Sequence, residues 1–135
     1  MAIPFPSEEW VKELMSRLNS SAAYAEIAKN WEGDLLFDIE YPDKTHKFLY
    51  LDLWHGKCRN AHQVPEGQAH KATFTLGAPL AIFIKVLKSE LDPIQAMVTG
   101  KLKVMGNMIV LMKNVPTVLE FVRTAQSIEA DFPAA

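Results

Sequence analysis

Residues 55–62 hold the side chains with the widest chemical potential, because they include His55, His62 and the single cysteine, Cys58. Imidazole and thiolate together are typical zinc ligands, and a thiol beside a histidine can act as a nucleophile. On an extended strand, however, His55 points away from Cys58 and His62, whereas zinc sites bring ligand pairs together through tight turns. His70 lies nearby in the chain, and no motif supplies an orienting acid or oxyanion donors. We therefore predict no metal site and no catalytic residue here.

Two other polar patterns also suggest chemistry at first sight. Asp34, Asp38 and Glu40 share one face of an alternating segment and could hold a cation or exchange protons. An antiparallel sheet with one face in water gives the same pattern, so we predict a solvated face. Gly100 and Lys101 are not followed by the Ser or Thr of a phosphate-binding loop, which excludes that motif.

The last third of the chain is rich in large apolar residues, with four methionines between positions 97 and 112. Methionine is flexible and polarizable, so a wall of methionines adapts to ligands of different shape. A plain core gives a similar pattern, but the amount of apolar helix exceeds what one sheet face needs, and a lined cavity would absorb the surplus. The predicted wall consists of Phe83, Leu87, Ile94, Met97, Leu102, Val104, Met105, Met108, Leu111, Met112, Val115 and Leu119.

Helices and then strands are predicted for the first half of the chain. Ser7 is a suitable N-cap for a helix over residues 7–18, and a second short helix ends before Gly33. From Asp34 the apolar period changes from about 3.6 to 2. This change predicts strands over residues 34–41, 48–54, 57–64 and 71–76. Four strands in series favour an antiparallel meander.

The second half of the chain is predicted to be mainly helical. Residues 80–88 are apolar nearly all round, which predicts a helix covered on most sides. Asp92 and Pro93 begin a short helix that Gly100 ends, and residues 101–105 alternate like one more strand. Asn107 then caps an apolar helix that Pro116 interrupts and that continues to about residue 128. The pattern as a whole predicts an α+β fold.

Composition limits the class of protein and of partner. A chain of 135 residues with 49% hydrophobic and 22% charged residues is typical of one globular domain, here residues 1–135. The formal charge of −2 and the absence of a basic block argue against nucleic acid as a partner. The longest apolar run, residues 80–84, is far below the roughly 18 residues that span a bilayer. An unpaired cysteine and a start without a secretory signal predict a cytoplasmic location.

Residues 92–97, 100–107 and 111–113 resemble the sterol carrier protein type 2 family, most specifically in Gly-Lys-x-Lys-x-x-Gly-Asn at 100–107. The order of predicted elements agrees with that family along essentially the whole chain. The resemblance implies a five-stranded, mostly antiparallel sheet covered by helices. It also implies an apolar tunnel between the sheet and the C-terminal helices, which takes fatty acyl chains, acyl-CoA, phospholipids or sterols. No catalytic residue, cofactor or metal is implied, and the family's peroxisomal ending is absent.

Three classes of function follow from these observations. The first is a lipid carrier that contacts membrane surfaces transiently and holds a polar headgroup near Lys85, Lys88 or Lys113. The second is a protein interaction module that uses the same fold with a filled core. The third is an enzyme that uses the histidine and cysteine segment. Bound lipid, a persistent metal ion or neither would distinguish the three.

Overall fold

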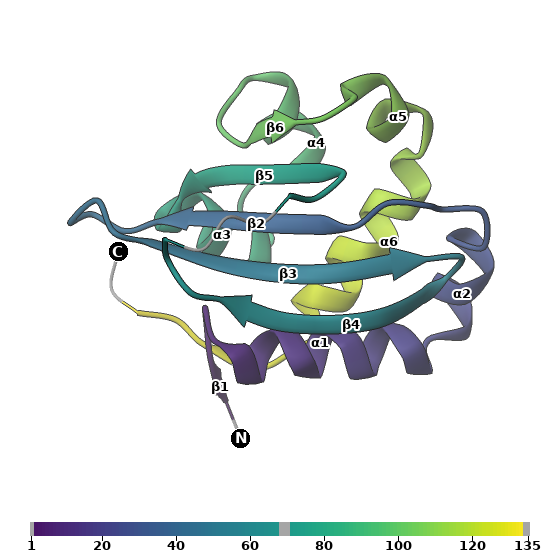
Figure 1. Cartoon of the computed structure of the whole chain (residues 1–135), viewed down its shortest axis with the longest axis horizontal. Helices are drawn as coiled ribbons and strands as arrows, with labels where there is room; N and C mark the ends of the chain where they lie inside the picture. The colour runs from purple at the N-terminus through teal and green to yellow at the C-terminus, as the bar shows by residue number, and fades with distance from the viewer. Residues whose placement is uncertain (1, 68–70, 134–135) are drawn as a thin grey trace.

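The computed structural model describes residues 2–67 and 71–133 and consists of a five-stranded sheet with helices packed on one of its faces (Figure 1). The strands of this sheet are β2 (Leu35–Glu40), β3 (His46–Trp54), β4 (Lys57–Val64), β5 (Phe74–Pro79) and β6 (Lys103–Met105). The helices are α1 (Glu8–Ser20), α2 (Ala22–Ile27), α3 (Leu80–Leu87), α4 (Pro93–Val98), α5 (Met108–Lys113) and α6 (Val115–Gln126). Two short strands, β1 (Ile3–Pro4) and β7 (Ala130–Asp131), pair in parallel apart from the main sheet.

Local sequence signals explain where most helices begin and end. Ser7 caps α1 by accepting a hydrogen bond from the Trp10 N–H, and Glu8 and Glu9 lie in the first turn, where the helix dipole favours negative charge. Ser21 follows α1 and caps α2 by accepting from the Tyr24 N–H. Asp92 and Asn107 cap α4 and α5 in the same way, and Pro116 lies in the first turn of α6. These boundaries agree with the predicted helices to within a few residues.

The sheet differs from the predicted meander in one pairing. The strand order is β4-β3-β2-β5-β6, and all neighbouring strands are antiparallel except β2 and β5, which are parallel. The chain therefore crosses from the β4 edge to the far side of β2 before β5 begins. Alternation within a strand shows which side chains share a face, but it does not encode which edge the strand joins. Parallel pairing suits β2 because it is an interior strand, with Leu35, Leu36 and Ile39 buried.

The two faces of the sheet have different environments. In Figure 1, α3 and α6 lie behind the sheet and α1 runs along β4, so the face turned to the viewer carries no helix. Leu35, Leu49 and Leu51 are buried on the helix side. Asp38 and Glu40 are partly exposed on the open side, as the alternation predicts. The large buried side chains are therefore concentrated between the sheet and the helices.

Candidate functional site

An apolar cavity of about 90 Å³ lies between the sheet and the helices. A single water needs about 10–15 Å³ of such space, so the cavity has room for more than one small group. Its wall takes residues from nearly every element: Phe5, Trp10, Tyr24, Trp31, Leu35, Phe37, Leu53, Leu76, Phe83, Val86, Leu87, Pro93, Met97, Leu102, Leu111, Thr117, Val118, Phe121, Val122 and Ala125. Such a wall offers dispersion contacts and burial to an apolar ligand.

Strand alternation and helix periodicity bring these side chains together. On β2, Leu35 and Phe37 face the helices, and Leu76 of the neighbouring β5 pairs with Phe37 in register. On α6, Phe121 and Ala125 are four residues apart and therefore lie on one helix face. The Phe37 ring makes an edge contact with the Phe83 ring, with centroids 5.9 Å apart, and lies 6.1 Å from the Phe121 ring. The aromatic contacts couple sheet, α3 and α6 at one side of the cavity.

Five of the twelve residues predicted from sequence line this cavity, namely Phe83, Leu87, Met97, Leu102 and Leu111. The structure does not place the other seven in its wall. Ile94, Val104, Met108, Met112 and Val115 are partly buried elsewhere, whereas Met105 is 69% and Leu119 38% exposed. Val104 pairs with Leu76 and lies on the same face of the sheet, so its neighbour Met105 must face outward. Contact between these seven residues and lipid stays a prediction.

The methionine-rich pattern missed the part of the wall that comes from the first half of the chain. Phe5, Trp10, Tyr24 and Trp31 all line the cavity and are buried. Trp10 in α1 and Tyr24 in α2 have the spacing of core residues, but no local signal distinguishes a core residue from one that borders a void. Packing of α1 and α2 against α6 is what brings them to the cavity.

The polar groups of the cavity wall are neutral. The Thr117 hydroxyl donates to the Ile27 carbonyl oxygen at 3.1 Å, and burial followed by the nearby Cys58 raises the pKa of Tyr24, which keeps its hydroxyl protonated. The Trp10 indole N–H is buried and has no hydrogen-bond partner within the described part of the chain. The Phe5 ring is its aromatic neighbour, at 4.7 Å between centroids and 73° between planes. An unpaired buried donor is costly, so this N–H is a candidate for a hydrogen bond to a bound molecule.

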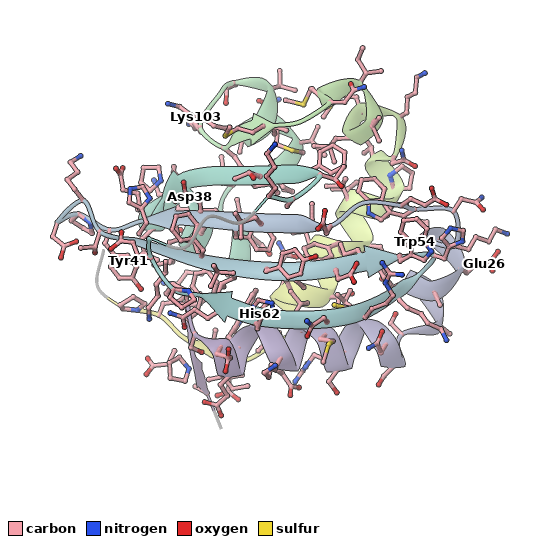
Figure 2. All side chains as sticks on the ribbon, viewed as in Figure 1. Glu26, Asp38, Tyr41, Trp54, His62 and Lys103 are labelled. Carbon is pink, nitrogen blue, oxygen red and sulfur yellow. The ribbon has the colours of Figure 1, made fainter. Side chains whose placement is uncertain are left out.

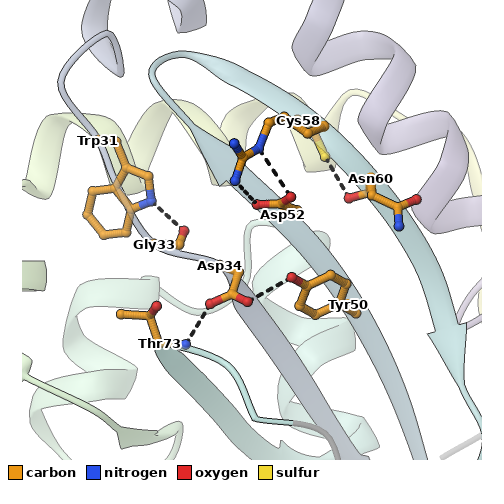
Figure 3. Close-up of polar contacts among 9 residues, drawn as sticks. Trp31, Gly33, Asp34, Tyr50, Asp52, Cys58, Asn60 and Thr73 are labelled. Carbon is orange, nitrogen blue, oxygen red and sulfur yellow. Dashed lines mark hydrogen bonds and ion pairs between the residues drawn. The ribbon is translucent and has the colours of Figure 1, made fainter.

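The histidine and cysteine segment has no catalytic arrangement among the residues described. The Cys58 thiol is buried and donates to the Asn60 carbonyl oxygen at 3.3 Å (Figure 3), and burial raises its pKa to about 12. A thiol with such a pKa stays protonated at neutral pH and is a poor nucleophile. His55 pairs with Glu32, and the His62 ring lies against Tyr50 on the open face of the sheet (Figure 2).

Possible metal ligands are also dispersed. Within residues 2–67 and 71–133, no three His, Cys, Asp or Glu side chains are close enough to hold an ion together. His70, which is near this segment in the sequence, lies outside the described residues. His55 is hydrogen-bonded to Glu32 and Cys58 to Asn60, so the histidine and the cysteine are not directed at a common ion.

Asp34, directly before β2, links β2 to β3 and to the start of β5 through its carboxylate. Its carboxylate accepts from the Tyr50 hydroxyl of β3 and from the Thr73 N–H just before β5, both at 2.7 Å (Figure 3). Burial works against ionisation of this carboxyl, but the two hydrogen bonds hold its pKa below the ordinary value. Burial is also the largest cause of the raised pKa of Tyr50, and the hydrogen bond to Asp34 raises it further. Asp34 is therefore a structural link for the parallel β2–β5 pairing.

Replacing Asp34 with Ala is expected to lower the free energy of unfolding by about 1–3 kcal/mol, because two donors lose a charged acceptor. A pKa lowered by folding stabilises the protein above the unfolded value, near pH 4, and this stabilisation is lost as the pH falls through the folded value. Urea unfolding at neutral pH and below pH 4 measures both effects. The difference between the wild type and Asp34→Asn should shrink in acid, and a constant difference would contradict this assignment.

The described part of the chain contains no helix that is both long and apolar enough to cross a bilayer.

The fold is similar to that of two solved proteins. A crystal structure of sterol carrier protein 2 superposes with a TM-score of 0.84 and 34% identity, covering 90% of this chain and 97% of that one. A conserved protein of Thermus thermophilus, described as possibly a sterol carrier protein, gives 0.85 and 32%, covering 98% and 94%.

The amino-acid sequence is also similar to a curated protein and to a family pattern. Mouse stomatin-like protein 1 is 29% identical over 115 residues, which is 83% of this chain and 27% of that protein. The chain thus spans about a quarter of the length of this curated relative. Residues 11–118 match the sequence pattern of the SCP-2 sterol transfer family. With this match, the five-stranded sheet and the two similar solved structures, the chain belongs to the SCP-2 sterol transfer family.

Proposed function

We propose that this protein binds lipid-like ligands in its apolar cavity and transfers them between membranes without covalent chemistry. The observation that carries the proposal is the cavity itself, whose wall is apolar and contains no charged side chain. The ligand class is fatty acyl chains, acyl-CoA, phospholipids or sterol-like molecules. Membership of a sterol transfer family supports this class, and the buried, protonated Cys58 argues against the histidine and cysteine enzyme.

The energetics of such a cavity suit transfer rather than storage. Each buried methylene contributes about 0.8 kcal/mol relative to water, so a long acyl chain would leave water readily. A bilayer offers the chain similar burial, so the net preference for protein over membrane is small. A carrier needs this balance, because a ligand held much more tightly than in the bilayer would not be released.

The cavity also restricts the polar part of the ligand. An ionised carboxylate or phosphate would lose its hydration in the apolar wall at a cost that no charged side chain there offsets. We propose that charged headgroups stay outside, near exposed lysines such as Lys85 and Lys113, and that the Trp10 N–H donates to a neutral oxygen of the ligand, from an ester, ketone or alcohol. The third lysine predicted to lie near a headgroup, Lys88, already has an aromatic partner, because its Nζ is 5.4 Å from the centre of the Phe132 ring.

Two measurements on freshly purified protein test the proposal. Native mass spectrometry of the protein, followed by extraction of its lipids, should find bound lipid. Fluorescent acyl probes of different chain length should compete with one another for one site. Acyl esters should compete better than alkanes of equal length, because only the ester carries an acceptor for Trp10. A bound metal ion would instead favour the enzyme, and the absence of both lipid and probe binding would favour an interaction module with a filled core.

A further inference from the structure

We propose that residues 93–119, hereafter the docking segment, attach the protein to anionic lipid membranes through α4, β6 and α5. This inference goes beyond the proposed function, because it assigns a membrane-contacting surface rather than a ligand. The three elements lie together beside β5 at one edge of the sheet (Figure 1). Vesicle binding can be measured without any transferred ligand, so failure of this proposal and failure of lipid binding in the cavity are distinguishable.

The docking segment exposes large apolar side chains that nothing in the described chain covers. Val98 at the end of α4 and Met105 at the end of β6 are each 69% exposed, and Ile109 in the first turn of α5 is 63% exposed. These are the three highest exposures among the large hydrophobic residues of the described chain. Because α4, β6 and α5 lie together, these exposed side chains all belong to one edge of the fold, and exposed apolar surface typically marks an interaction site. By contrast, α1 buries its apolar face through Trp10 and Leu14, so it offers no comparable surface.

The charge of the docking segment favours an anionic partner. It contains Lys101, Lys103 and Lys113 and neither aspartate nor glutamate, which gives a formal charge of +3. Because the whole chain carries −2, the remaining residues carry −2 − 3 = −5. Such a charge separation would orient the protein with this segment toward an anionic bilayer and its remainder away. All three lysines are exposed, and the described residues provide no ion-pair partner for them.

Two carboxylates beside this segment, Asp38 and Glu40, already have His46 as their partner. Asp38 and Glu40 line a shallow polar hollow on the open sheet face together with Lys101 and Lys103; Figure 2 labels Asp38 and Lys103. His46 Nδ1 lies 2.6 Å from Asp38 Oδ1, and its Nε2 lies 3.8 Å from Glu40 Oε2. The hydrogen bond to Asp38 raises the pKa of His46, which favours a positive charge between the two carboxylates. No ion pair among the described residues joins Lys101 or Lys103 to either carboxylate, so both lysines stay available to lipid phosphates.

The inner side of the docking segment forms part of the cavity wall. Pro93 and Met97 of α4, Leu102 before β6, Leu111 of α5 and Val118 of α6 all line the cavity. The helices α4 and α5 are only six residues each, so few main-chain hydrogen bonds hold them in place. Only the short helices α4 and α5 and the strand β6 would then separate the cavity from a membrane that contacts Val98, Met105 and Ile109. Docking through this segment would allow a lipid to pass without crossing water.

Vesicle cosedimentation of the full chain tests the docking segment. The wild type should bind phosphatidylcholine vesicles that contain phosphatidylserine, and binding to phosphatidylcholine alone should be much weaker. Replacing Lys101, Lys103 and Lys113 together with Gln should lower the partition coefficient on the order of a hundredfold, since each lysine near an anionic surface contributes about 1 kcal/mol. Met105→Gln with Ile109→Gln should also lower binding, and both sites are exposed enough to leave the fold intact.

Matched variants away from the docking segment provide the control. Lys44, Lys57 and Lys71 are exposed lysines elsewhere on the chain, and their joint replacement with Gln removes the same charge. Thermal melts confirm that each variant is folded. Equal losses from the two lysine triples would show that only net charge matters and would overturn the proposal. A wild type that ignores anionic vesicles would overturn it as well, while acyl-probe binding would remain the separate test of the cavity.

Discussion

Met97→Trp is expected to lower the affinity for acyl probes by about a hundredfold while leaving the stability of the ligand-free protein nearly unchanged. Met97 is buried and lines the cavity from α4, so a larger side chain would occupy space that a ligand otherwise takes. Excluding three or four methylenes at about 0.8 kcal/mol each corresponds to roughly 3 kcal/mol of lost binding. Probe titration and urea unfolding of the ligand-free protein measure the two quantities.

Met105→Trp is the matched control for this experiment. Met105 lies outside the cavity wall and is 69% exposed, so the same enlargement there should change neither probe affinity nor stability. The opposite outcome for Met97→Trp is also informative. If the site is fully packed, the enlargement should cost about 1–3 kcal/mol of stability and leave probe binding as it was. That result would remove the cavity as the ligand site and favour the interaction module.

Gly106→Ala is expected to be the most destabilising single methyl addition in the docking segment. The backbone of Gly106 has a φ of +129°, and a Cβ there would lie 2.6 Å from the Thr73 carbonyl oxygen and 2.8 Å from Phe74 Cδ1. Backbone strain costs about 1–3 kcal/mol, and forcing apart packed neighbours costs about 1–3 kcal/mol more. The expected loss of about 2–6 kcal/mol is a large part of the roughly 5–15 kcal/mol that typically stabilises a protein. Denaturant unfolding measures it.

Gly100→Ala separates the two contributions. Gly100 has a φ of +79°, but no other heavy atom lies within 4 Å of the position its Cβ would take. The substitution therefore adds strain without a clash, and we expect a loss of about 1–2 kcal/mol. Equal losses at the two glycines would contradict the close approach between Gly106 and β5. A smaller loss at Gly106 would show that β6 can move away from Thr73 at little cost.

Several features of this protein followed from the sequence because they depend on near neighbours in the chain. Ser7 and Asp92 cap helices through N–H groups two or three residues away, so their effect is encoded locally. The alternation in β2 and β3 likewise separates Leu35 and Leu49 from the open face without reference to any other element. The segment 100–107 carried the family resemblance, and the family assignment confirmed it. Helix ends, strand faces and family were therefore predictable.

The tertiary structure decided what depends on residues far apart in the chain. The parallel pairing of β2 with β5 places Asp34 against Thr73, 39 positions later, and no periodicity encodes that meeting. The cavity wall joins Trp10 to Phe121 and Met97 because α1 and α4 both pack against α6. The predicted wall included both Val104 and Met105, but neighbouring residues of a strand face opposite sides, and the pairing with Leu76 shows that Val104 is the one that faces inward. Composition reveals that apolar side chains are abundant, whereas the space left between them is a property of how the elements pack.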